Sequence, residues 1–252
     1  MSSSKRVLCA LLAVGVFVAL KPLAAMAQTD GEPPIRGGAV VSDKAPGDSF
    51  ERAKAHVIRQ TERRLTALDR LTGKIDNARH ITEDHAAPLL RDVAAAREAL
   101  RSGLAAVGAT TTPEELREVA PPIFQDTLVF ALLRPKTHEV IASDTVTAIG
   151  ERLTEFGAKL QDALDRISGE TDIDTTQAQS DLDEMIGLVN AATATGGPVA
   201  GNVISLQAAD WPDPAQAALR EGKAALGEAR SSLHEARGLA KVVVRFIRSA
   251  RS

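Results

Sequence analysis

Apolar and small residues recur in alternating steps of three and four over the last 40 or so residues of the chain, about 214–248. A repeat of this kind marks one apolar face of a long helix that packs along other helices. Because many of these positions are Ala or Gly, a partner helix is expected to approach closely. The positions are Leu219, Gly222, Leu226, Ala229, Leu233, Ala236, Ala240, Val243 and Ile247.

Similar stripes predict helices over about 50–77, from Thr82 to about 107, over about 138–167 and from about 174 onward. No stretch alternates apolar and polar residues with a period of two, as a strand would. The chain is therefore expected to be all-α: an elongated antiparallel bundle of long amphipathic helices with coiled-coil-like heptad seams. In the 138–167 helix the stripe is Ala142, Val146, Ile149, Leu153, Phe156, Leu160, Ala163 and Ile167.

Prolines and glycines suggest where helices begin and end. Thr112-Pro113-Glu114-Glu115 combines an N-cap, a first-turn proline and a capping-box acid, so a helix should start there. We expect an interruption at Pro121-Pro122, and a stop or kink at Arg134-Pro135 because an internal proline removes a helix hydrogen bond. A subdivision of the bundle near 134–137 is left open. Gly196-Gly197-Pro198 should end the helix that starts near residue 174.

The first 27 residues have the pattern of a secretory signal peptide. Lys5 and Arg6 precede an apolar run, Leu8–Leu20, and Ala25-Met26-Ala27 fits a cleavage site. The run is shorter than the roughly 20 residues of a membrane span, although retention as an uncleaved anchor stays an alternative. Residues 28–48 are rich in Pro and Gly and are expected to be a disordered linker, which leaves 49–252 as the helical bundle.

Composition restricts the chemistry of the exported chain. Loss of the leader leaves 27 basic and 33 acidic residues, a net charge of −6, which argues against nucleic acid as a partner. The only cysteine, Cys9, lies within the leader, so thiol chemistry is not expected. No transmembrane span is expected after cleavage.

Charge is segregated along the chain. Residues 137–211 carry 13 acids and three bases, whereas residues 212–252 carry four acids and eight bases. The basic last helix could lie against the acidic helices that precede it. Alternatively, its bases could contact an anionic surface such as an acidic envelope polymer or lipid headgroups. These bases are Lys241, Arg245, Arg248 and Arg251.

No catalytic, cofactor-binding or metal-binding residue is predicted. His80, Glu83, Asp84 and His85 form the densest cluster of potential ligands, but no second segment completes a set of three or four in fixed geometry. Acids are in any case expected at a helix start. His138-Glu139 begins no HExxH motif, because Ala142 stands where the second histidine belongs.

An apolar segment, Ile123–Leu133, precedes the expected break at Pro135 and could line a ligand pocket. Its aromatic residues Phe124 and Phe130, with His138 beyond the break, are the candidate pocket residues. Core packing is the alternative role for the two phenylalanines.

Three segments carry a resemblance: 62–85 (ERRLTALDRLTGKIDNARHITEDH), 129–144 (VFALLRPKTHEVIASD) and 202–230 (NVISLQAADWPDPAQAALREGKAALGEAR). With their arginine–proline and tryptophan–proline junctions between long helices, they resemble uncharacterised secreted Ala-rich helical proteins of actinobacteria. The resemblance implies a secreted helical protein and no catalytic residue.

These observations favour a secreted, non-enzymatic structural or interaction protein of the cell envelope or extracellular space. Its partner would be another protein or an envelope component, and the heptad seams are also compatible with self-association. The alternative is a bundle that binds an apolar or amphiphilic small ligand between its helices. No cofactor is expected.

Overall fold

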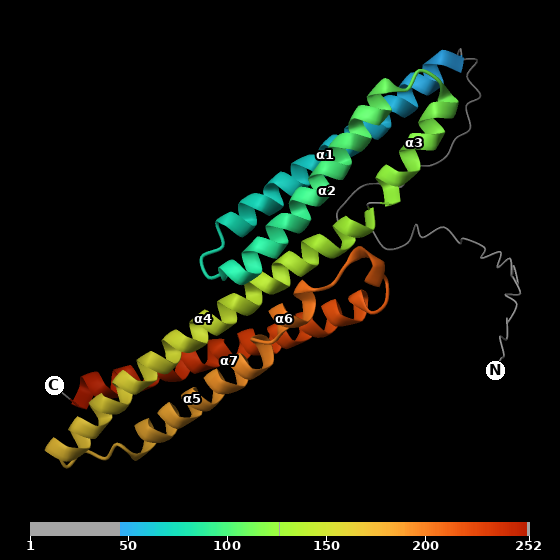
Figure 1. The fold of residues 1–252 in the computed structure, drawn as a ribbon. Coiled ribbons are helices and arrows are strands. Elements are labelled where there is room, and N and C mark those ends of the chain that lie inside the picture. The colour runs from blue at the N-terminus through green and yellow to red at the C-terminus, as the bar shows by residue number, and fades with distance from the viewer. Residues whose placement is uncertain (1–45, 126, 251–252) are drawn as a thin grey trace, which may run out of the picture. The chain divides into compact units, whose positions relative to one another are not determined.

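The chain is helical almost throughout in the computed structural model, which describes residues 46–125 and 127–250 (Figure 1). No strand occurs within those two ranges, so the predicted all-α bundle is confirmed. The predicted signal peptide and most of the linker lie outside the described residues. The helices are α1 (Pro46–Asp76), α2 (Glu83–Ala109), α3 (Pro113–Gln125), α4 (Thr127–Glu170), α5 (Thr176–Gly196), α6 (Val199–Ile204), a 3-10 turn (Ala208–Asp210) and α7 (Ala215–Ala250).

The helices pack in two groups that share α4. The hairpin of α1 and α2 packs with α3, and α4 contacts all three of these helices. The rest of α4 packs with α5, α6 and α7, and α5 and α7 make the most extensive contact of any pair. Figure 1 shows α5 running antiparallel to α4 and α7, which run in the same direction. The α4–α7 pair is thus a parallel element within the expected antiparallel bundle.

The predicted stripe of α7 is buried at every position. Small residues bring neighbouring helices close together, as expected. At Gly196 of α5, a methyl group would stand 2.8 Å from the Cβ of Ala229 and 3.0 Å from Val146. The tight α5–α7 contact therefore depends on residues with little or no side chain.

The expected interruption at Pro121-Pro122 and the expected stop at Arg134-Pro135 do not occur. Pro121-Pro122 lies inside α3, and Pro135 lies inside α4, which runs without a stop from Thr127 to Glu170. Each proline removes one backbone hydrogen bond. Burial of Ile123, Leu132 and Leu133 around these sites offsets that cost, because each buried apolar side chain contributes about 2 kcal/mol.

The predicted stripe of α4 is only partly covered. Its two ends are buried, but Ile149 and Leu153 are half-buried and Phe156 is 36 % exposed. Gly150 and Gly157 are among the α4 residues that pack against α5, where they lie next to Thr193 and Met185. The middle of the apolar stripe therefore faces outward. Within the described residues, no helix is long and apolar enough to cross a membrane.

Candidate binding groove between α4 and α7

The basic residues predicted near the C-terminus line a hollow between α4 and α7. Lys241, Arg245 and Arg248 border a hollow of about 510 Å³. Its apolar wall includes Leu153 and Phe156 of α4, the exposed part of the predicted stripe. Arg251 lies outside the described residues. The structure thus places three of the four predicted basic residues beside an uncovered apolar surface.

Two further hollows continue this one along the same pair of helices. The middle hollow, of about 450 Å³, shares Arg237 with the first. The third, of about 380 Å³, shares His138, Ala142 and Arg230 with the middle one. We call the three together the α4–α7 groove. On α7 it extends from Lys223 to Arg248, about 37 Å at the helical rise of 1.5 Å per residue.

The floor of the groove is apolar and comes from both helices. The α4 contribution is the stripe that the sequence predicts to be buried. The α7 contribution consists of residues that also pack into the core. The floor residues are Ala142, Val146, Ile149, Leu153 and Phe156 of α4, and Leu226, Leu233, Ala240 and Val244 of α7.

The rim of the groove is cationic. Besides Arg248, five bases of α7 line it: Lys223, Arg230, Arg237, Lys241 and Arg245. None of these five forms an ion pair with another described residue. The basic helix does pack along α4 and α5, but these bases do not pair with the acids of those helices, and they face the groove.

Glu139 is the one carboxylate among the residues that line the three hollows. It is 8 % exposed, and its buried Oε2 atom has no hydrogen-bond partner in the part of the chain that the structure describes. Burial raises the pKa of Glu139 to about 7, against an opposing effect of the Lys223 charge. At neutral pH this carboxyl is therefore divided between its neutral and ionised forms.

His138 stands between two of the hollows. Its Nε2 atom lies 3.0 Å from Lys74 Nζ, and since an ammonium group only donates, the imidazole accepts. Desolvation, followed by the charges of Lys74 and Arg134, lowers the pKa of His138. The ring is thus held in its neutral form at the edge of the groove.

Four other polar residues of α4 close to Glu139 are buried. Three of them have partners, whereas Thr137 Oγ1 forms no hydrogen bond with another described residue. Lys136 Nζ lies 2.8 Å from Asp92 Oδ2 and donates to the Leu206 carbonyl at 3.0 Å. Asp144 accepts from the Thr82 amide at 2.9 Å and lies 2.8 Å from His85 Nδ1. Ser143 Oγ accepts from the Ala200 amide at 3.1 Å and lies within hydrogen-bond distance of the Gly196 and Gly197 carbonyls. These groups join α4 to α2 and α6, so they hold the scaffold together.

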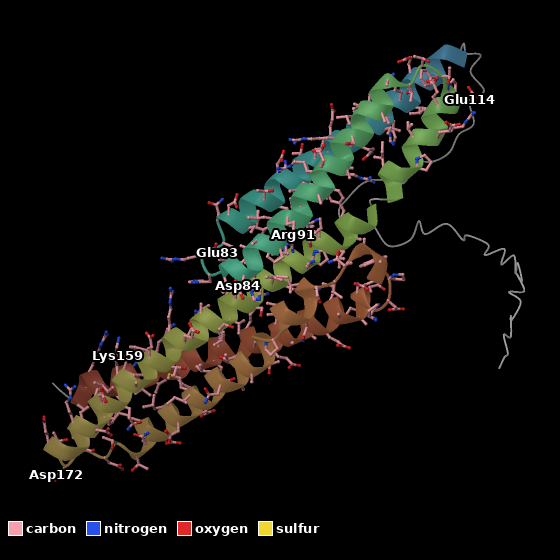
Figure 2. The ribbon with its side chains drawn as sticks, in the orientation of Figure 1. Glu83, Asp84, Arg91, Glu114, Lys159 and Asp172 are labelled. Atoms are coloured by element: carbon pink, nitrogen blue, oxygen red, sulfur yellow. The ribbon has the colours of Figure 1, made fainter. Side chains whose placement is uncertain are left out.

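The potential metal ligands at the start of α2 do not come together in one site. Glu83 and Asp84 are exposed (Figure 2), and His85 turns to Asp144. Among the described residues no group of three or more His, Cys, Asp or Glu side chains could hold a metal ion.

The predicted pocket residues are separated. His138 lines the groove, whereas Phe130 packs half-buried against the core and lines none of the hollows of the groove. The side chain of Phe124 lies outside the described residues. A ligand pocket formed by all three residues stays a prediction.

Comparison with known proteins identifies no relative of this chain. No family model, curated protein or solved structure matches this chain. The resemblance to secreted actinobacterial helical proteins stays a prediction, and function has to be inferred from the groove.

Proposed function

We propose that the protein is a secreted, non-enzymatic binding protein of the cell envelope that holds an anionic amphiphile along the α4–α7 groove. One observation carries the proposal: five cations that form no ion pair with another described residue border an apolar stripe that the fold leaves partly uncovered. An acyl or alkyl chain would cover the stripe, and an anionic group would pair with the rim.

The apolar floor and the basic rim of the groove should contribute different amounts of free energy to binding. Each CH₂ group transferred from water to an apolar surface contributes about 0.8 kcal/mol, so the chain of the amphiphile supplies most of the affinity. Exposed ion pairs contribute about 0–1 kcal/mol each and weaken with salt. The rim therefore selects the sign of the ligand's charge more than it sets the affinity.

An acidic amphipathic helix is a second candidate occupant, and the spacing of the rim favours it. Lys223, Arg230 and Arg237 follow at intervals of seven, which a helix with acids at the flanking heptad positions would match. This occupant corresponds to an interaction or scaffold function. A simple amphiphile does not require bases spaced seven residues apart. Experiments can therefore distinguish the two occupants.

Calorimetric titration of the purified protein with dodecanesulfonate, below its micelle concentration, tests the proposal. Dodecyltrimethylammonium has the same tail and the opposite charge. We expect the sulfonate to bind at least tenfold more tightly than the ammonium compound. Arg230→Gln/Arg237→Gln should remove most of this preference, whereas Arg152→Gln/Arg166→Gln, which removes the same charge from exposed positions of α4 outside the groove, should leave it unchanged.

Equal binding of the two detergents, or an equal effect of the two double variants, would overturn the proposal. A four-heptad peptide with leucine at the core positions and glutamate at the flanking positions tests the second candidate. Tight binding of this peptide together with no binding of the sulfonate would assign the groove to a protein partner.

A further inference from the structure

The groove is not uniform from end to end. At the Phe156 end, the lining consists of apolar floor residues and long basic side chains whose methylene groups can add to the apolar surface. At the opposite end, the wall is formed by polar groups around Glu139: Arg134, His138, Lys223 and Arg230. We call this end the Glu139 hollow. An amphiphile would therefore bind with a preferred direction.

The Glu139 hollow holds a polar group that the fold leaves unsatisfied. Glu139 is more than nine-tenths buried, and its Oε2 atom has no hydrogen-bond partner among the described residues. Lys223 is close enough to affect the pKa of this carboxyl but forms no ion pair with it. A buried oxygen without a partner costs about 1–3 kcal/mol, and more when the group is charged. Burial therefore favours the protonated form of Glu139, which can donate a hydrogen bond to a ligand in the hollow.

We propose that the Glu139 hollow is the headgroup site of the groove, where Glu139 in its protonated form donates a hydrogen bond to an oxyanion headgroup held by Arg134, Lys223 and Arg230. This inference rests on the proposed function, because it assigns the anionic end of the amphiphile to one end of the groove. The headgroup class is an oxyanion: carboxylate, phosphate or sulfonate.

The charges around Glu139 exclude a cationic headgroup. A ligand ammonium could pair with an ionised Glu139, but it would lie among Arg134, Lys223 and Arg230. An oxyanion is favoured for two reasons. The surrounding cations attract it, and protonated Glu139 donates a hydrogen bond to it, whereas an ionised Glu139 would repel it. The neutral form is accessible because burial raises the pKa of Glu139 to about 7.

Binding should consequently be coupled to proton uptake from solvent. A bound anion beside Glu139 disfavours the ionised form and raises its pKa further. The groups that face Glu139 are Arg134 and His138 of α4 and Lys223 and Arg230 of α7, while α6 contributes the apolar Val199. Of these, His138 has the ordinary pKa closest to neutrality. Desolvation, together with the charges of Lys74 and Arg134, lowers that pKa, so above pH 7 His138 binds few protons.

Dodecanesulfonate is the probe for this coupling, because its headgroup stays ionised at every pH used. Titrations at pH 6 and pH 8, each in buffers of different ionisation enthalpy, give the affinity and the number of protons taken up. At pH 8 we expect uptake approaching one proton per ligand, and binding about tenfold weaker than at pH 6. Glu139→Gln keeps the donor and should bind with nearly equal affinity at both pH values, without proton uptake at pH 8. Glu151→Gln, an exposed control on the same helix, should behave like the wild type.

The outcomes separate this inference from the proposed function. Selective binding of the sulfonate without proton uptake at pH 8 would overturn the headgroup assignment and leave the groove as the binding site. Undiminished proton uptake in Glu139→Gln would also overturn it, because the histidines would then carry the coupling. Absence of sulfonate binding would overturn both. Dodecanoate and dodecyl phosphate, compared at pH 8, then show which oxyanion the hollow prefers.

Discussion

Gly222 of α7 lies directly against the carboxylate of Glu139 on α4, and a methyl group at position 222 would overlap Glu139 Oε2. The same methyl group would stand 3.0 Å from Val199. Replacement of a helical glycine by alanine normally stabilises a protein by about 0.5–1 kcal/mol. At this position the overlap should dominate, because overpacking costs about 1–3 kcal/mol.

Gly222→Ala should therefore lower the free energy of unfolding by about 1–2 kcal/mol, measured by urea denaturation. Gly227 is the matched control, since it lies on the same helix with nothing within 4 Å of an added methyl group. Gly227→Ala should stabilise the protein by about 0.5–1 kcal/mol. Equal effects of the two substitutions would contradict the close approach of α7 to Glu139.

Glu139 should also make stability depend on pH. Its pKa is raised from the ordinary value of 4.5 to about 7 in the folded protein. Between these values the folded chain retains a proton that the unfolded chain has lost. The stabilisation is therefore complete below pH 4.5 and is lost as the pH rises through 7, by up to about 3 kcal/mol.

Glu139→Gln keeps the side chain neutral, so this loss should disappear. At pH 8 the variant should be more stable than the wild type by about 3 kcal/mol, and at pH 4.5 the two should be nearly equal. Urea denaturation at both pH values measures the difference. Glu151→Gln should follow the wild-type profile, and parallel profiles for Glu139→Gln and the wild type would show that Glu139 is not protonated preferentially in the fold.

The sequence predicts the burial of a helix face well where the whole face packs against other helices of the chain. Every predicted seam position of α7 is buried, because each faces another helix of the same chain. The α4 stripe has the same spacing, but Phe156 and its neighbours are left uncovered. Periodicity shows that a face is apolar and not what covers it, so the groove could not be recognised from the pattern alone.

A candidate pocket residue and a candidate basic residue line the same groove, although nothing in the sequence indicates that they lie together. His138 and Lys241 are about 100 residues apart, and they line one groove because α4 and α7 run parallel. In the sequence, Glu139 stands out only as part of an incomplete HExxH pattern. Its burial depends on Gly222, a residue of another helix, so only the packing of α7 reveals it.

The contact between Lys136 and Asp92 should be energetically asymmetric. Lys136 is 1 % exposed, whereas Asp92 is accessible enough to be hydrated. Asp92→Ala leaves a buried ammonium group with only the Leu206 carbonyl as acceptor, and it should cost about 3 kcal/mol. Lys136→Met preserves the apolar volume and leaves a carboxylate that water can reach, so it should cost less.

Urea denaturation of the two single variants and the double variant measures this asymmetry. The double variant should be less destabilised than the sum of the single variants, because the buried charge is gone. A larger loss for Lys136→Met than for Asp92→Ala would mean that the lysine stem, and not its charge, stabilises the contact between α2 and α4.

Phe156 should contribute to binding and little to stability. It is 36 % exposed and forms part of the apolar floor of the groove. Phe156→Ser should change the free energy of unfolding by less than about 0.5 kcal/mol. It should weaken the binding of octadecanesulfonate about fivefold, because this longer chain extends from the Glu139 hollow to Phe156 and an apolar contact of about 1 kcal/mol is lost. Val242 is the matched control, an exposed apolar residue of α7 that does not line the groove. Val242→Ser should leave binding unchanged. If both variants weaken binding equally, the detergent adheres to exposed apolar residues in general, and the α4–α7 groove is not its site.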